Sequence, residues 1–407
     1  MVPLTAHASL SSACQQSELS VTDVLVRGAE IAGFCAANAA AIDHNGAFPV
    51  KEFALLADAG LLAAPLKPEF GGLGLGIDAN VTGAMLMLLK QMGRGNLAVG
   101  RLYEGHVNAL QLIQTFGTRE QIERYAEDAR DRHKIFGVWN AEAEDGVNMS
   151  PLENGRYRLE GSKTFCSGSG FVDRPFVNGP LLDGPWQMCV VPMEAVATVS
   201  DPSWWQPSGM KATASFKVNF SGVELEASAL IGKPGDYFRQ PWLTTGVIRF
   251  AAVQLGGAEA LFDATRQYLR DLNRTTDPYQ QERLGRMAIA IESGNLWLRS
   301  AAAFVKAYAP LFAGDPNQPP DQADQLVAYA NMVRTTIEQI CMDVMQLCER
   351  SVGTRGLLPP YPMERIIRDL TLYLRQPVFD AALATVGQYA LAQSHPAHSL
   401  WFDAADG

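Results

Sequence analysis

The hydrophobic and polar positions of this chain change their period twice along its length. From about residue 21 to 133, apolar residues recur at the three- and four-residue spacing of amphipathic helices, as in FPVKEFALLADAGLLAAPL. From about 134 to 235 the runs are short and β-rich, and turn signals such as Asn154-Gly155 separate them. From about 236 to 407, four long segments with a helical period follow one another.

These patterns predict an α+β multidomain protein. We expect an N-terminal α-helical domain at 21–133, a middle β-barrel or β-sandwich domain at 134–235, and a C-terminal four-helix bundle at 236–407. Residues 1–20 are polar and lack the basic-then-apolar order of a signal peptide, so we expect a disordered tail there. The bundle helices should pair with a second copy, which predicts a homodimer or a homotetramer.

Composition and charge exclude several classes of function. The net charge of −10 argues against nucleic acid as a partner, because such binding needs clustered Lys and Arg. The apolar run that begins at Gly83 is broken by Lys90, and no run approaches the ~20 residues of a membrane span, so no membrane partner is expected. The six Cys show no CxxC and no metal-ligand spacing. We therefore expect no metal site and a cytoplasmic protein.

The segment GSKTFCSGSG, residues 161–170, is the first candidate for chemistry. It places one Lys, one aromatic residue and a run of small residues between two segments that are typical of strands. Small residues allow another group to approach the backbone closely. The residues alone leave two interpretations open, a strand end with a glycine-rich turn or the border of a flat ligand.

Four segments stand out in chain order: FPVKEFALLADAGLLAAPLKPEFGGLGLG, GRYRLEGSKTFCSGSG, PSGMKATASFKVNFSGVEL and YPMERIIRDL. Together they resemble the acyl-CoA dehydrogenase superfamily. That resemblance covers the chain from about residue 21 to its end, and it implies an FAD-dependent oxidoreductase that acts on the CH–CH group of an acyl thioester. The small-molecule substrate implied is an acyl-CoA.

The resemblance also implies which residues meet the FAD. Phe165 falls where an aromatic residue packs against the isoalloxazine, and Ser167 falls where a hydroxyl meets its O4/N5 edge. On the partner strand, FGVWNAEAEDG, Trp139 and Ala141 are the implied contacts, and Ala141 replaces the Thr that the family usually has. Arg274 and Gln281 are the nearest matches to the pair that reaches the FAD of a neighbouring subunit, although the family's Arg-x-x-Phe-Gly motif is missing there.

The familiar catalytic bases of the family are absent from this chain. The Glu that usually follows the Arg-Asp element is replaced by Gln376 or Pro377, and the alternative Glu position, just before Arg249, holds Ile248. The stretch LRQPVFD resembles instead the Leu-His-Asp-Pro-Val stretch of the dibenzothiophene monooxygenase branch. Arg375 occupies the place of that His, where its guanidinium could hold an anionic group of substrate or flavin.

The segment RLYEGHVNAL, residues 101–110, offers a replacement base. Glu104 and Asn108 share one helix face, and His106 is turned aside. Glu104 or His106 could take the substrate proton, with Arg101, Asn108 and Gln376 lining the substrate pocket. The other interpretation of these polar residues is an ordinary polar start of a helix.

Three functions remain open at this point. The first is a dehydrogenase with a relocated base, served by an electron-transfer flavoprotein. The second is a monooxygenase that takes reduced flavin from a flavin reductase. The third is a family member that has lost its chemistry. Binding of flavin, and reduction of that flavin by an acyl-CoA without oxygen, would separate them.

Overall fold

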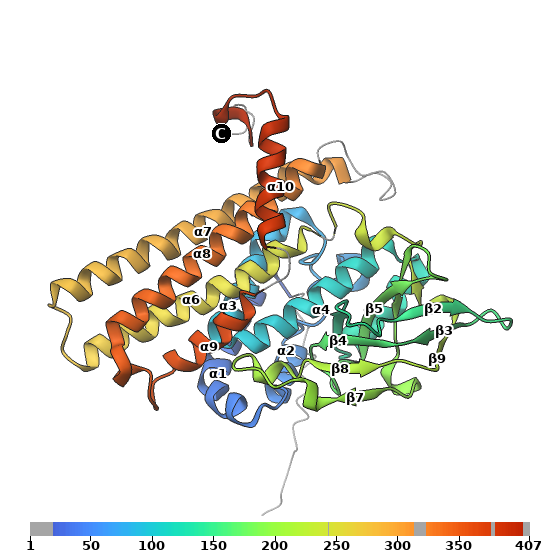
Figure 1. Cartoon of the computed structure of the whole chain (residues 1–407), viewed down its shortest axis with the longest axis horizontal. Coiled ribbons are helices and arrows are strands. Elements are labelled where there is room, and N and C mark those ends of the chain that lie inside the picture. The colour runs from blue at the N-terminus through green and yellow to red at the C-terminus, as the bar shows by residue number, and fades with distance from the viewer. Residues whose placement is uncertain (1–18, 243, 313–322, 376–378, 402–407) are drawn as a thin grey trace, which may run out of the picture.

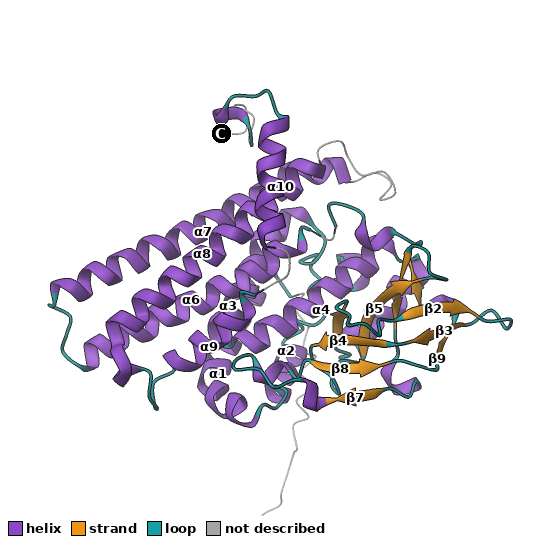
Figure 2. Ribbon diagram, viewed as in Figure 1, coloured by secondary structure: helices purple, strands orange, loops and turns teal. Residues whose placement is uncertain are grey.

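The computed structural model describes residues 19–242, 244–312, 323–375 and 379–401 (Figure 1). Helices form the N-terminal part, strands the middle part and helices the C-terminal part, and the strands gather at one end of the molecule (Figure 2). This order confirms the predicted fold class. The N-terminal helices are α1 (Val21–Asn45), α2 (Val50–Asp58), α3 (Thr82–Gly95), α4 (Leu97–Phe116) and α5 (Arg119–Arg130).

Helix α1 begins with a capping box. Ser20 accepts a hydrogen bond from the Asp23 backbone, and the Asp23 carboxylate accepts one from the Ser20 backbone, so Ser20 belongs to the helix start and not to a tail. By length and composition alone, Val21–His44 could cross a membrane. Its buried side packs against α3 and contributes Val24 and Cys35 to the main core.

The strands form three small sheets within the described residues. Their orders are β1-β5-β6-β10, β2-β3-β9 and β4-β8-β7, and β1 with β5 is a parallel pair. The strands are β1 (Phe136–Trp139), β2 (Asn148–Pro151), β3 (Tyr157–Glu160), β4 (Ser162–Cys166), β5 (Arg174–Pro180), β6 (Trp186–Val190), β7 (Val199–Asp201), β8 (Phe216–Asn219), β9 (Val223–Leu225) and β10 (Leu230–Ile231).

Three long C-terminal helices run side by side, and the fourth departs from the expected bundle. Helix α10 contacts α8 but crosses it and projects from the bundle, instead of lying along it (Figure 1). Leu383 and Leu391 of α10 are 55% and 89% exposed, so packing within this chain does not hold α10 parallel to its neighbours. The C-terminal helices are α6 (Gly246–Asp271), α7 (Pro278–Phe312), α8 (Ala323–Gly356), α9 (Met363–Tyr373) and α10 (Phe379–Ala392).

Helix α4 links the parts of the molecule. Leu102 and Val107 belong to the core that α4 shares with α1, α3 and the C-terminal helices. Leu110 and Ile113, further along the same helix, belong to a second core formed with α5 and the β1 sheet. Because both cores fix α4, its polar side chains are held on a rigid element between the β domain and the bundle.

Candidate active site

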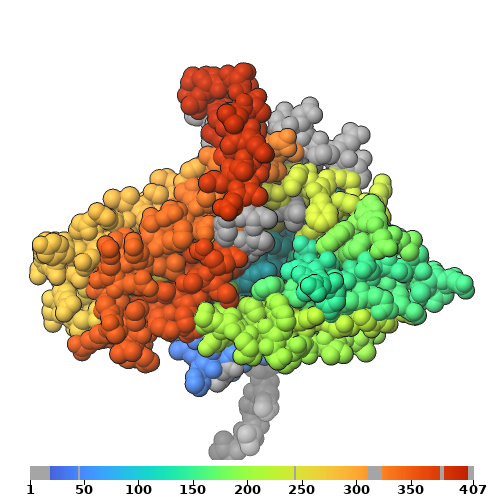
Figure 3. Space-filling model, in the orientation of Figure 1, coloured from blue at the N-terminus to red at the C-terminus, as the bar shows by residue number. Residues whose placement is uncertain are grey.

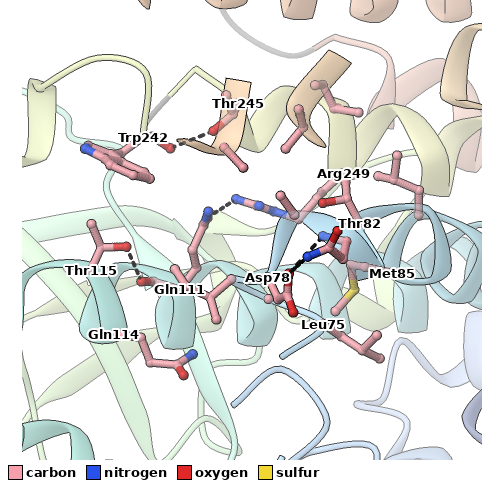
Figure 4. Close-up of a pocket in the computed structure, with 18 of the residues that line it drawn as sticks. Leu75, Asp78, Thr82, Met85, Gln111, Gln114, Thr115, Trp242, Thr245 and Arg249 are labelled. Carbon is pink, nitrogen blue, oxygen red and sulfur yellow. Dashed lines mark hydrogen bonds between the residues drawn. The ribbon is translucent and has the colours of Figure 1, made fainter. Parts of the chain in front are cut away.

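A cavity of about 490 Å³ lies between α4 and α6 (Figure 4). Its volume falls in the range of small-molecule sites. Figure 4 shows Gln111 and Thr115 of α4 on one side and Trp242 and Thr245, just before α6, on the other. The apolar lining comes from α3, α6, α7, α8 and the loop before α3, and includes Leu75, Ile77, Met85, Leu86, Ile248, Val305 and Leu326.

A chain of polar side chains leads along α4 to this cavity. Arg101 donates to the Glu104 carboxylate at 2.6 Å, and Asn108 donates to the other oxygen of the same carboxylate. Arg249 of α6 then donates to the side-chain carbonyls of Asn108 and Gln111. The four α4 residues lie on one helix face at spacings of three and four. From residue 101 to 111 the helix rises about 15 Å, so this row of hydrogen-bonded polar side chains connects the cavity to the N-terminal half of α4.

Arg249 is the charged residue at which this row of polar side chains reaches the cavity wall. Burial lowers the pKa of its guanidinium to about 10, and the Glu104 carboxylate opposes that change. The group therefore keeps its charge at neutral pH. Arg101 neutralises Glu104 directly, and the two hydrogen-bond partners of Arg249 are neutral amides. The sequence showed Arg249 only as the neighbour of a missing base; its pairing with α4 depends on the packing of α4 against α6.

His106 is held on the opposite side of α4 by backbone groups. Its Nε2 lies 2.8 Å from the Leu62 carbonyl oxygen and therefore donates to it, while Nδ1 accepts from the Phe136 N–H at 3.1 Å. Burial lowers the pKa of the ring to about 4. Both nitrogens are occupied in one neutral tautomer, so this geometry suits a structural link between α4 and β1 and leaves no nitrogen for a substrate proton.

Phe165 is displayed by an irregularity in β4. The pairing of β4 with β8 shifts register between Lys163 and Cys166, and Phe165 has a left-handed φ of 51°. Such bulges turn a side chain away from its expected direction. The Phe165 ring is 53% exposed and meets the rings of Trp204 and Trp205 edge-on, at centroid distances of 4.7 and 6.0 Å. The two Trp were missed from the sequence, although the adjacent pair in PSWWQ is a signal.

Ser167 begins a short line of hydroxyls. Its Oγ lies 2.8 Å from Ser215 Oγ, which lies 2.7 Å from Thr213 Oγ1. Thr213 donates to the Met210 carbonyl oxygen at 2.8 Å. Because the Thr213 proton is used there, Ser215 must donate to Thr213 and Ser167 must donate to Ser215. Ser167 thus presents lone pairs outward, and it must rotate its hydroxyl before it can donate to a ligand.

Trp139 and Ala141 flank this segment differently. Trp139 is 1% exposed, and its indole N–H donates to the Ser167 carbonyl at 2.9 Å, so it supports the segment from behind. Ala141 is exposed, and its carbonyl accepts from the Thr164 N–H at 2.8 Å. Only Ala141 is therefore open to a ligand.

The segment around Phe165 lies where the β domain meets α4 and α9. Gly168 packs closely on Leu102 of α4, and the Met210 N–H donates to Asp369 of α9. Figure 3 shows a hollow between the C-terminal helices and the β domain, with the surface of the α4 region visible at its floor. An exposed aromatic group beside a hydroxyl suits a flat ring with a polar edge, so Phe165 and its neighbours fit an isoalloxazine.

Arg375, at the end of α9, lies against α8. It forms an ion pair with Glu338 at 3.5 Å and contacts the Met342 sulfur, and its side chain is 55% exposed. It does not line the cavity. The structure therefore does not bring Arg375 together with Glu104. Gln376 lies outside the described residues.

Arg274 and Gln281 lie at the turn between α6 and α7. Both are exposed, and Gln281 donates to the Thr275 carbonyl at 2.9 Å. This turn is at the end of the bundle far from the β domain of the same chain (Figure 1). Within one chain the two residues do not meet Phe165, and their contact with the flavin of a second subunit stays a prediction.

Two family models match this chain in sequence order. Residues 29–131 match the acyl-CoA dehydrogenase N-terminal domain, and residues 248–380 match the acyl-CoA dehydrogenase C-terminal domain. Dibenzothiophene monooxygenase of Rhodococcus erythropolis is 26% identical over 87% of this chain and 89% of its own. Short-chain-specific acyl-CoA dehydrogenase of Clostridium acetobutylicum is 27% identical over 81% of this chain and 86% of its own.

Solved structures of the same fold agree with these matches. A Paenibacillus dibenzothiophene monooxygenase in complex with FMN and indole superposes with a TM-score of 0.82 at 22% identity, over 93% of this chain and 99% of that one. Methanesulfinate monooxygenase of Pseudomonas fluorescens gives a TM-score of 0.80 at 22% identity, over the same shares of the two chains. The chain belongs to the acyl-CoA dehydrogenase superfamily, whose matching relatives are flavin-dependent enzymes.

Proposed function

We propose that this protein is a monooxygenase that uses reduced flavin, with its substrate in the cavity between α4 and α6. The observation that carries this proposal is Ile248. It lines the cavity at a position where some dehydrogenases of this fold have their catalytic Glu, and it is apolar and 3% exposed. An acyl-CoA dehydrogenase needs a base there to take the α-proton while a hydride leaves. Transfer of an oxygen atom to an electron-rich centre needs no such base.

The other groups near the cavity do not replace the missing base. Glu104 is 2% exposed and is occupied by both Arg101 and Asn108. His106 is occupied by backbone groups at both nitrogens. Asp78 is the carboxylate among the described lining residues, but it is exposed and accepts from the Asn80 N–H at 2.8 Å as a helix cap.

With a reduced flavin bound there as the source of two electrons, one atom of O₂ would enter the substrate, and the other would leave as water with two protons. The residues of this chain hold the ring and keep water away: Phe165 and Trp204 offer an aromatic surface, and Ser167 orients the polar edge. The cavity holds the substrate.

The relatives support this choice over dehydrogenation, since dibenzothiophene monooxygenases match over more of the chain than the acyl-CoA dehydrogenases do. The missing Arg-x-x-Phe-Gly motif near Arg274 favours FMN, which lacks the adenine half of FAD. A separate flavin reductase is the proposed electron partner, and a second copy of the chain is the proposed structural partner.

A dehydrogenase with Glu104 as a relocated base is the second candidate. The observation that favours it is the position of Glu104 on the polar chain that reaches the cavity. For this role Asn108 or Arg101 would have to release the carboxylate when substrate binds.

Anaerobic reduction of bound flavin separates the two candidates. Butyryl-CoA and octanoyl-CoA should leave the flavin oxidised, whereas a flavin reductase with NADH and O₂ should support oxygenation of indole or dibenzothiophene. Fast reduction by either thioester would overturn the monooxygenase proposal. Glu104→Gln, His106→Asn and Arg375→Ala should then be compared, because a loss confined to Glu104→Gln would identify the relocated base.

Flavin binding tests the site itself. Ser167→Ala should weaken flavin binding by about 1.5–3 kcal/mol, the worth of a hydrogen bond to a charged partner. Ser169→Ala is the matched control, because that hydroxyl lies in the same segment but donates inward to the Cys166 carbonyl at 2.7 Å. Equal affinities for wild type and Ser167→Ala, measured by flavin fluorescence, would remove Ser167 from the flavin site.

A further inference from the structure

We propose that the substrate of the cavity carries a small oxyanion, a carboxylate or a sulfinate, that Arg249 binds, attached to an apolar body. This inference rests on the proposed function only in taking the cavity as the substrate site. It predicts that such an anion binds the cavity more tightly than neutral heterocycles such as indole and dibenzothiophene. It also excludes a thioester, whose acyl end is uncharged.

The first observation is how the charge of Arg249 is compensated. Its Nε and Nη2 groups donate to the amide oxygens of Asn108 and Gln111, and no carboxylate of the described residues lies within ion-pair distance of it. Lys90, which points into the same helical core, is instead paired directly with Glu259 at 2.7 Å. The remaining Nη1 of Arg249 belongs to a side chain that lines the cavity and is not fully buried.

This arrangement orients the guanidinium without neutralising it. A guanidinium has five N–H donors in a planar fork, and the fork matches the two oxygens of a carboxylate or sulfinate. The two amides fix the plane of the fork from the α4 side. Because they carry no charge, the positive potential of Arg249 extends into the cavity, where a low dielectric makes it stronger than in water.

The second observation is the charge balance of the lining. Lys67 is a second cation of the cavity, and no carboxylate of the described residues forms an ion pair with it. Asp78 is exposed and is used as a helix cap. Two cations therefore face one capped carboxylate, in a chain whose net charge is −10. A locally positive cavity in an acidic protein selects an anion over a neutral molecule.

The third observation is the apolar remainder of the wall. Apart from Arg249, Lys67 and Asp78, the lining carries no charge and much of it is apolar, which suits a ligand whose remaining part is apolar. The apolar lining residues include Met85, Leu86, Val305 and Leu326.

The test measures binding of simple probes to the flavin-free protein, without catalysis. Octanoate and octane-1-sulfinate should each bind at least tenfold more tightly than octanamide, and Arg249→Gln should weaken the two anions by roughly 10- to 100-fold while leaving octanamide unchanged. Arg249→Lys should recover part of the loss. Arg266→Gln is the matched control, since Arg266 lies on the same helix but pairs with Asp263 at the surface.

A second variant keeps the test decisive if Arg249→Gln folds poorly. Glu104→Gln removes a nearby negative charge that repels an anion in the cavity, so it should tighten octanoate binding several-fold and leave octanamide unchanged. Equal affinity for octanoate and octanamide in the wild type would overturn the inference, even if indole is oxygenated. Binding of the anions through Arg249 would uphold it, even if no oxygenation occurs and the proposed function fails.

Discussion

Two desolvated cations of this molecule, Lys163 and Arg249, lie in opposite surroundings. Lys163 in β4 is fully buried; its ammonium donates to the Glu142 carboxylate, to the Asn140 carbonyl at 3.2 Å and to the Asn178 side chain at 3.3 Å. It also lies 4.8 Å from the centre of the Trp186 ring. All of its donors have partners within the β domain.

Arg249 is also desolvated, but its partners are neutral and one side of it meets a cavity. Burial lowers the pKa of both groups, and in Lys163 a direct ion pair opposes that change. A cation neutralised by the protein stabilises the fold, whereas one that is oriented but not neutralised has capacity left for a ligand. The two cations differ in their partners, and Arg249 is also the less deeply buried of the two because it lines the cavity.

The largest effect that tests this comparison is expected at Lys163. Lys163→Met should lower the free energy of unfolding by about 3 kcal/mol, because it leaves Glu142 and Asn178 without their common partner in a buried site. Urea unfolding followed by circular dichroism measures it. Lys217→Met is the control: its ion pair with Asp145 is at the surface, and its loss should cost less than about 1 kcal/mol. Equal costs in the two variants would contradict a structural role for Lys163.

The next effect is the pH dependence of stability that arises from His106, whose two ring nitrogens bond backbone groups. Its folded pKa of about 4 lies below the ordinary 6.5, so the unfolded chain binds the proton more readily. The contribution of His106 is therefore complete near pH 7 and is lost as the pH falls towards 4, by roughly 3 kcal/mol. The measurement is the free energy of unfolding against pH for wild type and His106→Gln, whose side chain does not titrate.

The pH dependence of the wild type alone does not isolate His106, because Asp369 also titrates in this pH range. Burial raises the pKa of its carboxyl to about 6, so its contribution has the opposite sign and favours the folded state as the pH falls from 6 towards 4. The two contributions partly cancel in the wild type. The difference between wild type and His106→Gln isolates His106, and parallel curves for the two proteins would show that the ring titrates normally.

The sequence predicted the fold further than it predicted the site. Periodicity located the helical and β-rich regions, because a helix or strand with one buried face repeats its apolar residues at a fixed local spacing. It did not predict the crossing of α10 over α8, which depends on packing between distant segments. The sequence singled out Glu104, yet it could not show that Arg101 and Asn108 occupy that carboxylate, nor that backbone groups fix His106.

The same limit applies to the residues that display the proposed flavin edge. Phe165 was found through a resemblance, while the bulge that exposes it arises from the pairing of β4 with β8. Trp204 and Trp205 reach Phe165 only in the folded chain. Arg249 was visible as a residue, but its neutral partners come from α4, about 140 positions earlier, and no local pattern connects them.

The smallest effect is expected at Arg249, and it sharpens the comparison most. Arg249→Gln should change the free energy of unfolding by less than about 1 kcal/mol, because removal of the charge also removes its desolvation cost, and the freed Gln111 amide lines the cavity. Arg101→Gln is the contrast, since it leaves the buried Glu104 carboxylate without its ion pair and should cost clearly more. Urea unfolding of the two variants measures both. If Arg249→Gln loses as much stability as Lys163→Met, Arg249 is a structural cation like Lys163, and its charge is not held ready for a ligand.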